Sequence, residues 1–200
     1  MARDILKTLK DEHDNLRKLF DDLEDTTDRA VKTRGDLLDE IETKLILHAK
    51  WEEKVLYPAF KERADRDGLQ TLAEAVAEHH AVENSVLPEV HAAEPGTPVF
   101  AGRTKVFGEF VDHHAKEEEK TMFKMVRELF SAEERSQLDE AYEEWKASPG
   151  AERVLLAEKT KASQQAPHAT GNDGRSRVHT RPVSLDRVCR PAITLQCRPV

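Results

Sequence analysis

The sequence predicts an all-α protein, an up-down-up-down four-helix bundle with a short extra C-terminal helix and a disordered tail. Three observations lead to this prediction. Glycine and proline are scarce before residue 150, apolar residues recur every three or four positions over long stretches, and short polar segments separate those stretches. Helices with short connections pack antiparallel beside their chain neighbours, and four such helices form a bundle.

The first two helices are expected over about residues 3–25 and 36–64. In the first, leucines from Leu6 to Leu23 recur at helical spacing. In the second, the same spacing is found from Leu38 onward, and Gly68 follows in the position of a helix stop signal.

The third helix is expected over about 69–93 and the fourth over about 99–130, because the intervening Glu-Pro-Gly-Thr-Pro segment is typical of a turn. These four helices make residues 1–130 the predicted bundle domain. The first 130 residues therefore contain every element that the bundle needs.

A helical extension is expected over residues 131–165. Ser131 and Glu134 have the spacing of a capping box, which opens a shorter helix. One more exposed helix is expected at 151–165. From residue 166 the helical periodicity stops and Arg, Pro, Ser and Thr dominate, so 166–200 is interpreted as a disordered basic tail.

Charge is unevenly divided along the chain. Residues 1–165 carry 25 Lys and Arg against 37 Asp and Glu, a net of −12, whereas residues 166–200 carry six Arg against two Asp, a net of +4. An acidic body argues against nucleic acid as the main partner. The longest apolar runs are only a few residues, which argues against a membrane span.

The cytoplasm is the expected location. The N-terminal residues have charges where a signal peptide would need an apolar segment. Both cysteines, Cys189 and Cys197, lie near the C-terminus, so the bundle has no thiol for a disulfide or a metal. Any metal site in the bundle must therefore be built from histidines and carboxylates.

Each predicted apolar stripe contains one histidine at an inward position, and on three of the stripes a carboxylate follows one turn later. The inward polar residues are His13, His48, Glu52, His79, Glu83, His114 and Glu118. A carboxylate in an apolar interior costs several kcal/mol unless a positive charge compensates it. Apart from Arg17, no lysine or arginine recurs on these stripes, so a bound cation is the simplest compensation.

An internal repeat strengthens the metal interpretation. Residues 48–54 read HAKWEEK and residues 114–120 read HAKEEEK, an offset of 66 that also maps Glu12-His13 onto Glu78-His79. Two helical hairpins with this pattern would pack about a pseudo-twofold axis. Such an axis favours two metal ions with shared carboxylates.

The repeat also selects among neighbouring polar residues. It picks His79 and His114 from two His-His pairs and leaves His80 and His113 as expected surface residues, because one residue rotates a helix by about 100°. His91 has no partner by spacing and is expected to be exposed. For Glu53 and Glu119 a solvated face is expected, with a hydrogen bond to a ligand histidine as the alternative.

These motifs resemble the hemerythrin-like, HHE cation-binding family, whose pattern is His, His-x-x-x-Glu, His, His-x-x-x-Glu. The resemblance covers about residues 1–130. It implies that His13 and His48 bind one iron ion and that His79 and His114 bind a second. It further implies that Glu52 and Glu118 bridge the two ions, and that the cofactor is two non-haem irons, with manganese or zinc as less favoured substitutes.

The sequence departs from the oxygen-carrying hemerythrins at two positions. Those proteins have a histidine four residues after the third-helix histidine, where this chain has Glu83, and an aspartate five residues after the fourth-helix histidine, where it has Glu118 at four. One histidine fewer argues against reversible oxygen carriage. Glu83 is a further candidate ligand.

The expected function is a cytoplasmic di-iron protein that binds, senses or decomposes a small oxidant, namely O2, peroxide or NO. Catalase-like peroxide decomposition is one form of this function, and the residues do not separate it from sensing. Iron storage or buffering is an alternative from the same ligands. A metal-free interaction bundle is another, and no protein partner is identified by the sequence.

Overall fold

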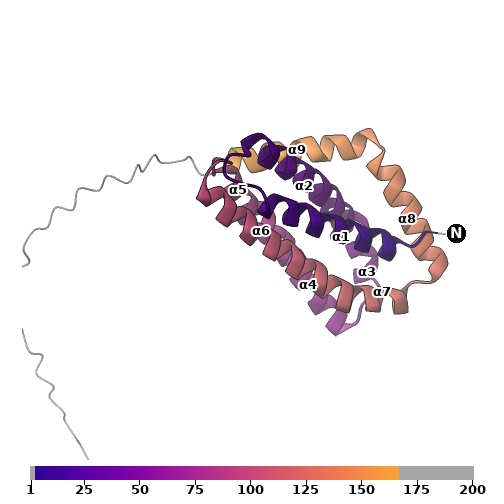
Figure 1. Ribbon diagram of the computed structural model, residues 1–200. Coiled ribbons are helices and arrows are strands. Elements are labelled where there is room, and N and C mark those ends of the chain that lie inside the picture. Colours follow the sequence, from indigo (N-terminus) through magenta and orange to yellow (C-terminus); the bar gives the residue numbers. More distant parts are fainter. Residues whose placement is uncertain (1–2, 167–200) are drawn as a thin grey trace, which may run out of the picture. The chain divides into compact units, whose positions relative to one another are not determined.

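In the computed structural model, which describes residues 3–166, the chain forms helices and these residues contain no strand. The tail predicted at 166–200 lies almost wholly outside the described residues. Four long helical segments lie side by side, each antiparallel to the next along the chain (Figure 1). The predicted all-α bundle is therefore confirmed.

The first two segments of the bundle are joined by a short loop. The first is α1 (Ile5–Glu24), which Asp4 caps by accepting a hydrogen bond from the Leu6 amide. The second consists of α2 (Val31–Trp51), the π-helical turn η1 (Glu52–Leu56) and α3 (Tyr57–Lys61). It begins five residues before the predicted start.

The third and fourth segments repeat this construction. The third consists of α4 (Arg66–Ala81), the π-helical turn η2 (Val82–Val86) and α5 (Leu87–His91). The fourth consists of α6 (Pro98–Glu117), the π-helical turn η3 (Glu118–Met122) and α7 (Phe123–Leu129).

Gly68 does not end the second segment, as the sequence had indicated, but lies in the first turn of α4. Asp65 caps this turn, and a Cβ at Gly68 would lie 2.9 Å from Ala64 Cβ. The glycine is therefore needed for the close approach of the chain at the α3–α4 corner.

Two further helices pack on the outside of the bundle. Helix α8 (Ala132–Lys146) packs against α1, and α9 (Pro149–Gln165) packs against α2 and α5 (Figure 1). The predicted capping box is present, since Ser131 Oγ accepts from the Glu134 amide while the Glu134 carboxylate accepts from the Ser131 amide. None of the helices in the described part of the chain is long and apolar enough to cross a bilayer.

The apolar interior is divided into two clusters. One surrounds Ile5, Leu9 and Phe60, and the other surrounds Phe20 and Phe107, all almost fully buried. Along α1 the first cluster ends at Leu9 and the second begins at Leu16, with a buried polar layer between them. That layer holds the residues singled out in the sequence.

The three π-helical turns shift the register of the buried faces. Val55, Val86 and Met125, which continue the helical spacing of the apolar residues before each turn, are only partly buried, whereas residues one position further along, such as Leu56 and Leu87, are buried. A π-helical turn contains one residue more than an α-helical turn, so the apolar stripe moves by one position after it.

Candidate metal centre

The four histidines selected by the repeat meet at the centre of the bundle. They come from α1, α2, α4 and α6, and each is at most 8% exposed: His13, His48, His79 and His114. They form two pairs. The Nε2 atoms of His13 and His48 lie 3.0 Å apart, and those of His79 and His114 lie 3.1 Å apart.

A glutamate accepts a hydrogen bond from the Nδ1 of every one of these histidines. Glu119 accepts from His13 at 3.0 Å, Glu12 from His48 at 2.9 Å, Glu53 from His79 at 3.0 Å and Glu78 from His114 at 2.8 Å. With Nδ1 donating, a neutral imidazole presents its Nε2 lone pair to the centre. This arrangement is typical of metal-binding histidines.

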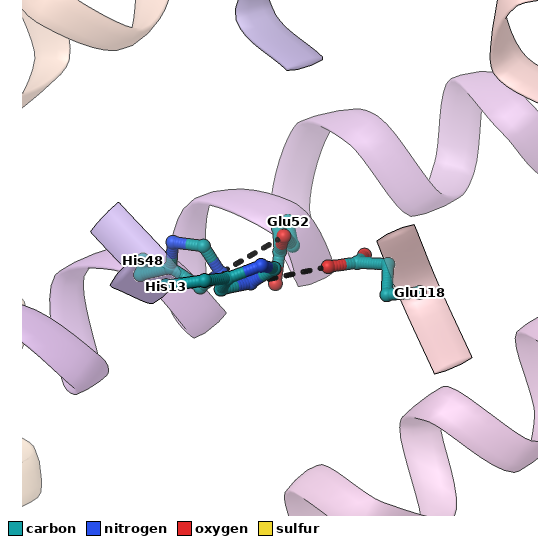
Figure 2. A group of neighbouring side chains, drawn as sticks. All are labelled: His13, His48, Glu52 and Glu118. Atoms are coloured by element: carbon teal, nitrogen blue, oxygen red, sulfur yellow. Dashed lines mark hydrogen bonds and ion pairs between the residues drawn. The ribbon is translucent and has the colours of Figure 1, made fainter. Parts of the chain in front are cut away.

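Two further carboxylates, Glu52 and Glu118, complete the centre and are 0% and 3% exposed. One Glu52 oxygen lies 3.2 Å from His48 Nε2 and the other 3.6 Å from His79 Nε2. Glu118 Oε2 lies 3.4 Å from His13 Nε2. Figure 2 shows the two carboxylates and the His13 and His48 rings converging on one point.

The donor atoms fall into two groups whose members lie within 4.8 Å of one another. The first half of the centre consists of His13, His48, Glu52 and Glu118, and the second half consists of His79, His114 and Glu52. Glu52 thus belongs to both halves, the placement required of a bridging carboxylate. Glu118 belongs to the first half only, so its predicted bridging role stays a prediction.

The hydrogen-bonding state of these atoms fits a pair of cations. Among the described residues, neither oxygen of Glu52 has a hydrogen-bond partner, and the same holds for Glu118 Oε2. Buried carboxylate oxygens are normally paired, because an unpaired buried charge costs several kcal/mol. A metal ion in each half would compensate the carboxylates and separate the facing histidine nitrogens.

The pKa values of the buried groups also reflect charges that lie close together without a cation. Burial and the neighbouring charge of Glu52 raise the pKa of Glu118 to about 8. Burial lowers the pKa of His48, but the charges of Glu52 and Glu12 outweigh this effect and raise it well above its usual value. Burial and the proximity of His48 lower the pKa of His13. Without a metal the centre must therefore hold protons in place of cations.

The outer glutamates are anchored differently in the two halves. Burial raises the pKa of Glu12, but hydrogen bonds from His48, from Lys146 at 2.9 Å and from the Tyr142 hydroxyl at 2.8 Å hold it at about 2. Helix α8 supplies both of the latter groups. Within residues 3–166, the matching Glu78 forms ion pairs only with His114 and, at 3.4 Å, with His113.

The other two outer glutamates are each paired with a cation. Glu119 accepts from Arg17 at 2.9 Å, and Glu53 accepts from Lys50 at 2.9 Å. Burial raises the pKa of Glu53, but its bonds from His79 and Lys50 hold it at about 2. The expectation of a solvated face for Glu53 and Glu119 is wrong, and the alternative, a hydrogen bond to a histidine, describes both.

Other polar residues are also placed by the structure. Glu83 lies in neither group and instead forms an ion pair with the buried Lys50. His80 and His113 are exposed, as predicted. His91 was expected to be exposed and is not, since it is partly buried and lies 2.9 Å from the buried Glu42.

One aromatic difference separates the halves. The Tyr57 hydroxyl lies 3.4 Å from His79 Nε2 of the second half and 3.5 Å from Glu118 Oε1 of the first half, so a phenol lies between the two halves. The repeat places Phe123 at the equivalent position, and its ring stacks on His13 at 6.0 Å. Only the tertiary structure shows which of the two rings reaches a donor atom.

A helical bundle with two buried groups of histidine and glutamate, one carboxylate common to both, belongs to the class of cation-binding helical bundles with a site suited to two metal ions. The family comparison agrees with this class. Residues 4–155 match the Hemerythrin HHE cation binding domain, and the chain belongs to this family.

A DNA nickase of Nostoc sp. (strain PCC 7120) is 26% identical over 133 residues. The aligned part covers 66% of this chain and 36% of that protein, so the chain spans about a third of its relative's length. No solved structure matches the chain significantly.

Proposed function

We propose that the protein is a non-haem di-iron protein that binds, senses or decomposes a small oxidant such as O2, peroxide or NO. The observation that carries this proposal is the placement of Glu52, a fully buried carboxylate shared by two histidine pairs and without a hydrogen-bond partner among the described residues. In this proposal His13 and His48 hold one ion, and His79 and His114 hold the other.

The donor set supports iron as the metal. Imidazole and carboxylate without thiolate suit iron, manganese or zinc. Iron, when bound, would supply open coordination positions and a one-electron couple. Three or four protein donors in each half leave room for such positions.

A small cavity next to the histidines supports a ligand of few atoms. It has a volume of about 40 Å³, touches all four histidines, and is otherwise lined mainly by aliphatic side chains such as Leu16, Ile46, Val82 and Val111. A cavity of this size holds about one water-sized molecule. It supports a diatomic or peroxide-sized ligand at this point of the centre.

The surrounding residues would hold the donors in place and keep protons where they are needed. The four outer glutamates fix the Nδ1 proton of each histidine and so direct each Nε2 to the centre. Tyr57 places a hydroxyl beside Glu118 and His79, where it donates a hydrogen bond to the carboxylate. The two apolar clusters flank the polar layer on either side.

DNA nicking is not part of this proposal. The similarity to the nickase covers only about a third of that protein, and residues 1–165 carry a net charge of −12. An acidic surface repels the phosphate backbone. We propose instead that the small oxidant is the principal partner of this domain.

The proposal is tested by metal analysis and an optical spectrum of protein grown with iron. We expect iron in both halves and a charge-transfer absorption, followed by oxygen release on adding peroxide or a spectral change on adding NO. Labile iron without this absorption would indicate storage instead. Protein that contains no metal and takes up none would contradict the proposal.

A further inference from the structure

The two halves of the centre differ in their access to solvent. The 66-residue repeat allows position-by-position comparison of the helix ends that flank them. Beside the first half, the turn of α1 that faces η1 presents Ile5 and Leu9, and η1 contributes Leu56; all three are 0% exposed. Beside the second half, the equivalent positions hold Thr71, Ala75 and Met122, and these line a cavity of about 70 Å³.

This cavity, the α4–η3 channel, is lined by Thr71, Glu74, Ala75, Glu78, His114, Glu117, Glu118, Thr121 and Met122. No lysine or arginine is among these lining residues, although Lys120, outside the lining, donates to Glu117 at 3.3 Å. The carboxylate side chains that line it range from exposed to almost fully buried. Glu74 is exposed, the Glu117 side chain is 44% exposed, that of Glu78 is 19% exposed, and that of Glu118 is 1% exposed.

The inner end of the channel reaches the metal centre itself. Glu118 is buried, and its Oε2 has no hydrogen-bond partner in the described part of the chain. His114, from the other half of the centre, also lines the channel. A cation that passes Glu74 and Glu117 would therefore meet donors of both halves.

The corresponding face of the first half is closed. Trp51 stands at the position equivalent to Glu117, is 1% exposed, and contacts Tyr142 of α8 with ring centroids 4.8 Å apart. A wide cavity of about 670 Å³ beside α8 reaches Glu12 but is lined by neither His48 nor Glu52. In front of Glu12 lie Tyr142 and Lys146, which both bond to it.

Two other cavities touch the histidines and suit a hydrated cation less well. The 40 Å³ cavity is lined mainly by aliphatic side chains, and of its two carboxylates, Glu78 and Glu83, the second is paired with Lys50. A third, of about 270 Å³, reaches His13 between α1 and α6. It is lined by four carboxylates, Asp21, Glu24, Glu109 and Asp112, but also by Arg17, and neither Glu52 nor Glu118 lines it. A fixed guanidinium opposes the passage of a cation, and no lysine or arginine is among the residues that line the α4–η3 channel.

We propose that the α4–η3 channel is the route by which divalent metal ions enter and leave the centre, with Glu74 and Glu117 as the outer attracting groups and Glu78 as the inner one. This inference rests on the proposed metal centre. It assigns a role to Glu74 and Glu117, which are not members of the donor set. Ions would reach Glu118 and His114 first, and Glu52 would then share them between the two halves.

The test measures how fast metal-free protein takes up Fe(II) without oxygen, with a chromogenic chelator reporting the unbound ion. The variant Glu74→Lys with Glu117→Lys reverses the charge at the mouth of the channel. Glu24→Lys with Glu109→Lys is the matched control, because it makes the same charge change beside the rival cavity at Arg17. Circular dichroism verifies that both variants are helical.

We expect the channel variant to load about tenfold more slowly than wild type at low ionic strength, with a smaller difference in high salt and the same final iron content. The control should load nearly as fast as wild type. Equal rates for wild type and channel variant, or slower loading by the control, would overturn the proposed route. Failure of the wild type to bind iron would instead contradict the metal centre.

A second variant tests the proposed route by placing a larger side chain in the channel. Ala75→Leu places at position 75 the residue that the closed half has at position 9. It should slow both uptake and release of iron to a chelator, while the final iron content is unchanged. Unchanged release from a folded Ala75→Leu protein would show that ions leave by another path.

Discussion

The two halves of the centre each contain a histidine pair and share Glu52, but their surroundings differ. In each half two histidines face each other and glutamates hold their Nδ1 atoms. Around the first half, α8 anchors Glu12 and covers Trp51. Around the second half, Glu78 has no lysine or arginine partner among the described residues, and a channel reaches the surface. The repeat thus places a histidine pair in each half, and the contacts of α8 make the surroundings of the two halves unequal.

The largest effect is expected from the residue that the halves share. Glu52→Gln removes a charged donor from both groups at once, so iron content should fall in both halves. Glu118→Gln should affect mainly the first half, because Glu118 belongs to that group alone. Iron analysis of the two purified variants makes the comparison. Equal losses would show that Glu118 bridges as well.

Lowering the pH should destabilise the fold by protonating Glu12 beside the first half of the centre. The pKa of Glu12 in the folded chain is about 2, below its usual 4.5, so ionised Glu12 stabilises the fold above about pH 4.5 and this contribution is lost as the pH falls toward 2. The contribution is at most about 3 kcal/mol. Denaturant unfolding of metal-free protein between pH 6 and pH 3 measures it, and Glu12→Gln should flatten the dependence. An unchanged slope in Glu12→Gln would contradict the anchoring.

The α8 anchor should affect one half selectively. Tyr142→Phe combined with Lys146→Met removes both groups that α8 gives to Glu12. The affinity of one ion should fall by about tenfold, since groups that orient a ligand histidine typically contribute this much, while the other ion is retained. Stepwise iron titration resolves the two, and Glu140→Gln, an exposed residue of α8, is the control. A loss shared equally by both ions would contradict the selectivity.

The smallest effect is expected from Tyr57. Its contacts of 3.4 and 3.5 Å are long, so Tyr57→Phe should change the affinity of the second ion by less than about tenfold. Phe123→Tyr makes the reciprocal change in the first half. Optical spectra of both iron-loaded variants should differ from that of wild type, because each variant changes the surroundings of a different ion. Identical spectra would show that the phenol only packs.

The bundle and the inner donors were predictable because both follow from periodicity. The stripe and the 66-residue offset need only that one helical face points inward, and His13, His48, His79 and His114 lie on that face. The repeat also contained the outer glutamates. For two of them, Glu53 and Glu119, a solvated face was expected ahead of a hydrogen bond to a histidine, because a stripe describes one face and says nothing of the hydrogen bonds at its edge.

The remaining features depend on tertiary structure. The π-helical turns shift the stripe after Glu52 and Glu118, and local sequence does not show them. The contacts of Tyr142 and Lys146 with Glu12 span about 130 positions and require α8 to fold back onto α1. The pairing of His91 with Glu42 arises in the same way from helices that meet only in the folded bundle.

The most direct test of the central claim is anomalous X-ray diffraction at the iron absorption edge from crystals of iron-loaded protein. We expect two anomalous peaks, one beside the facing nitrogens of His13 and His48 and one beside those of His79 and His114, with Glu52 between them. A single peak, or no peak within bonding distance of these nitrogens, would contradict the account.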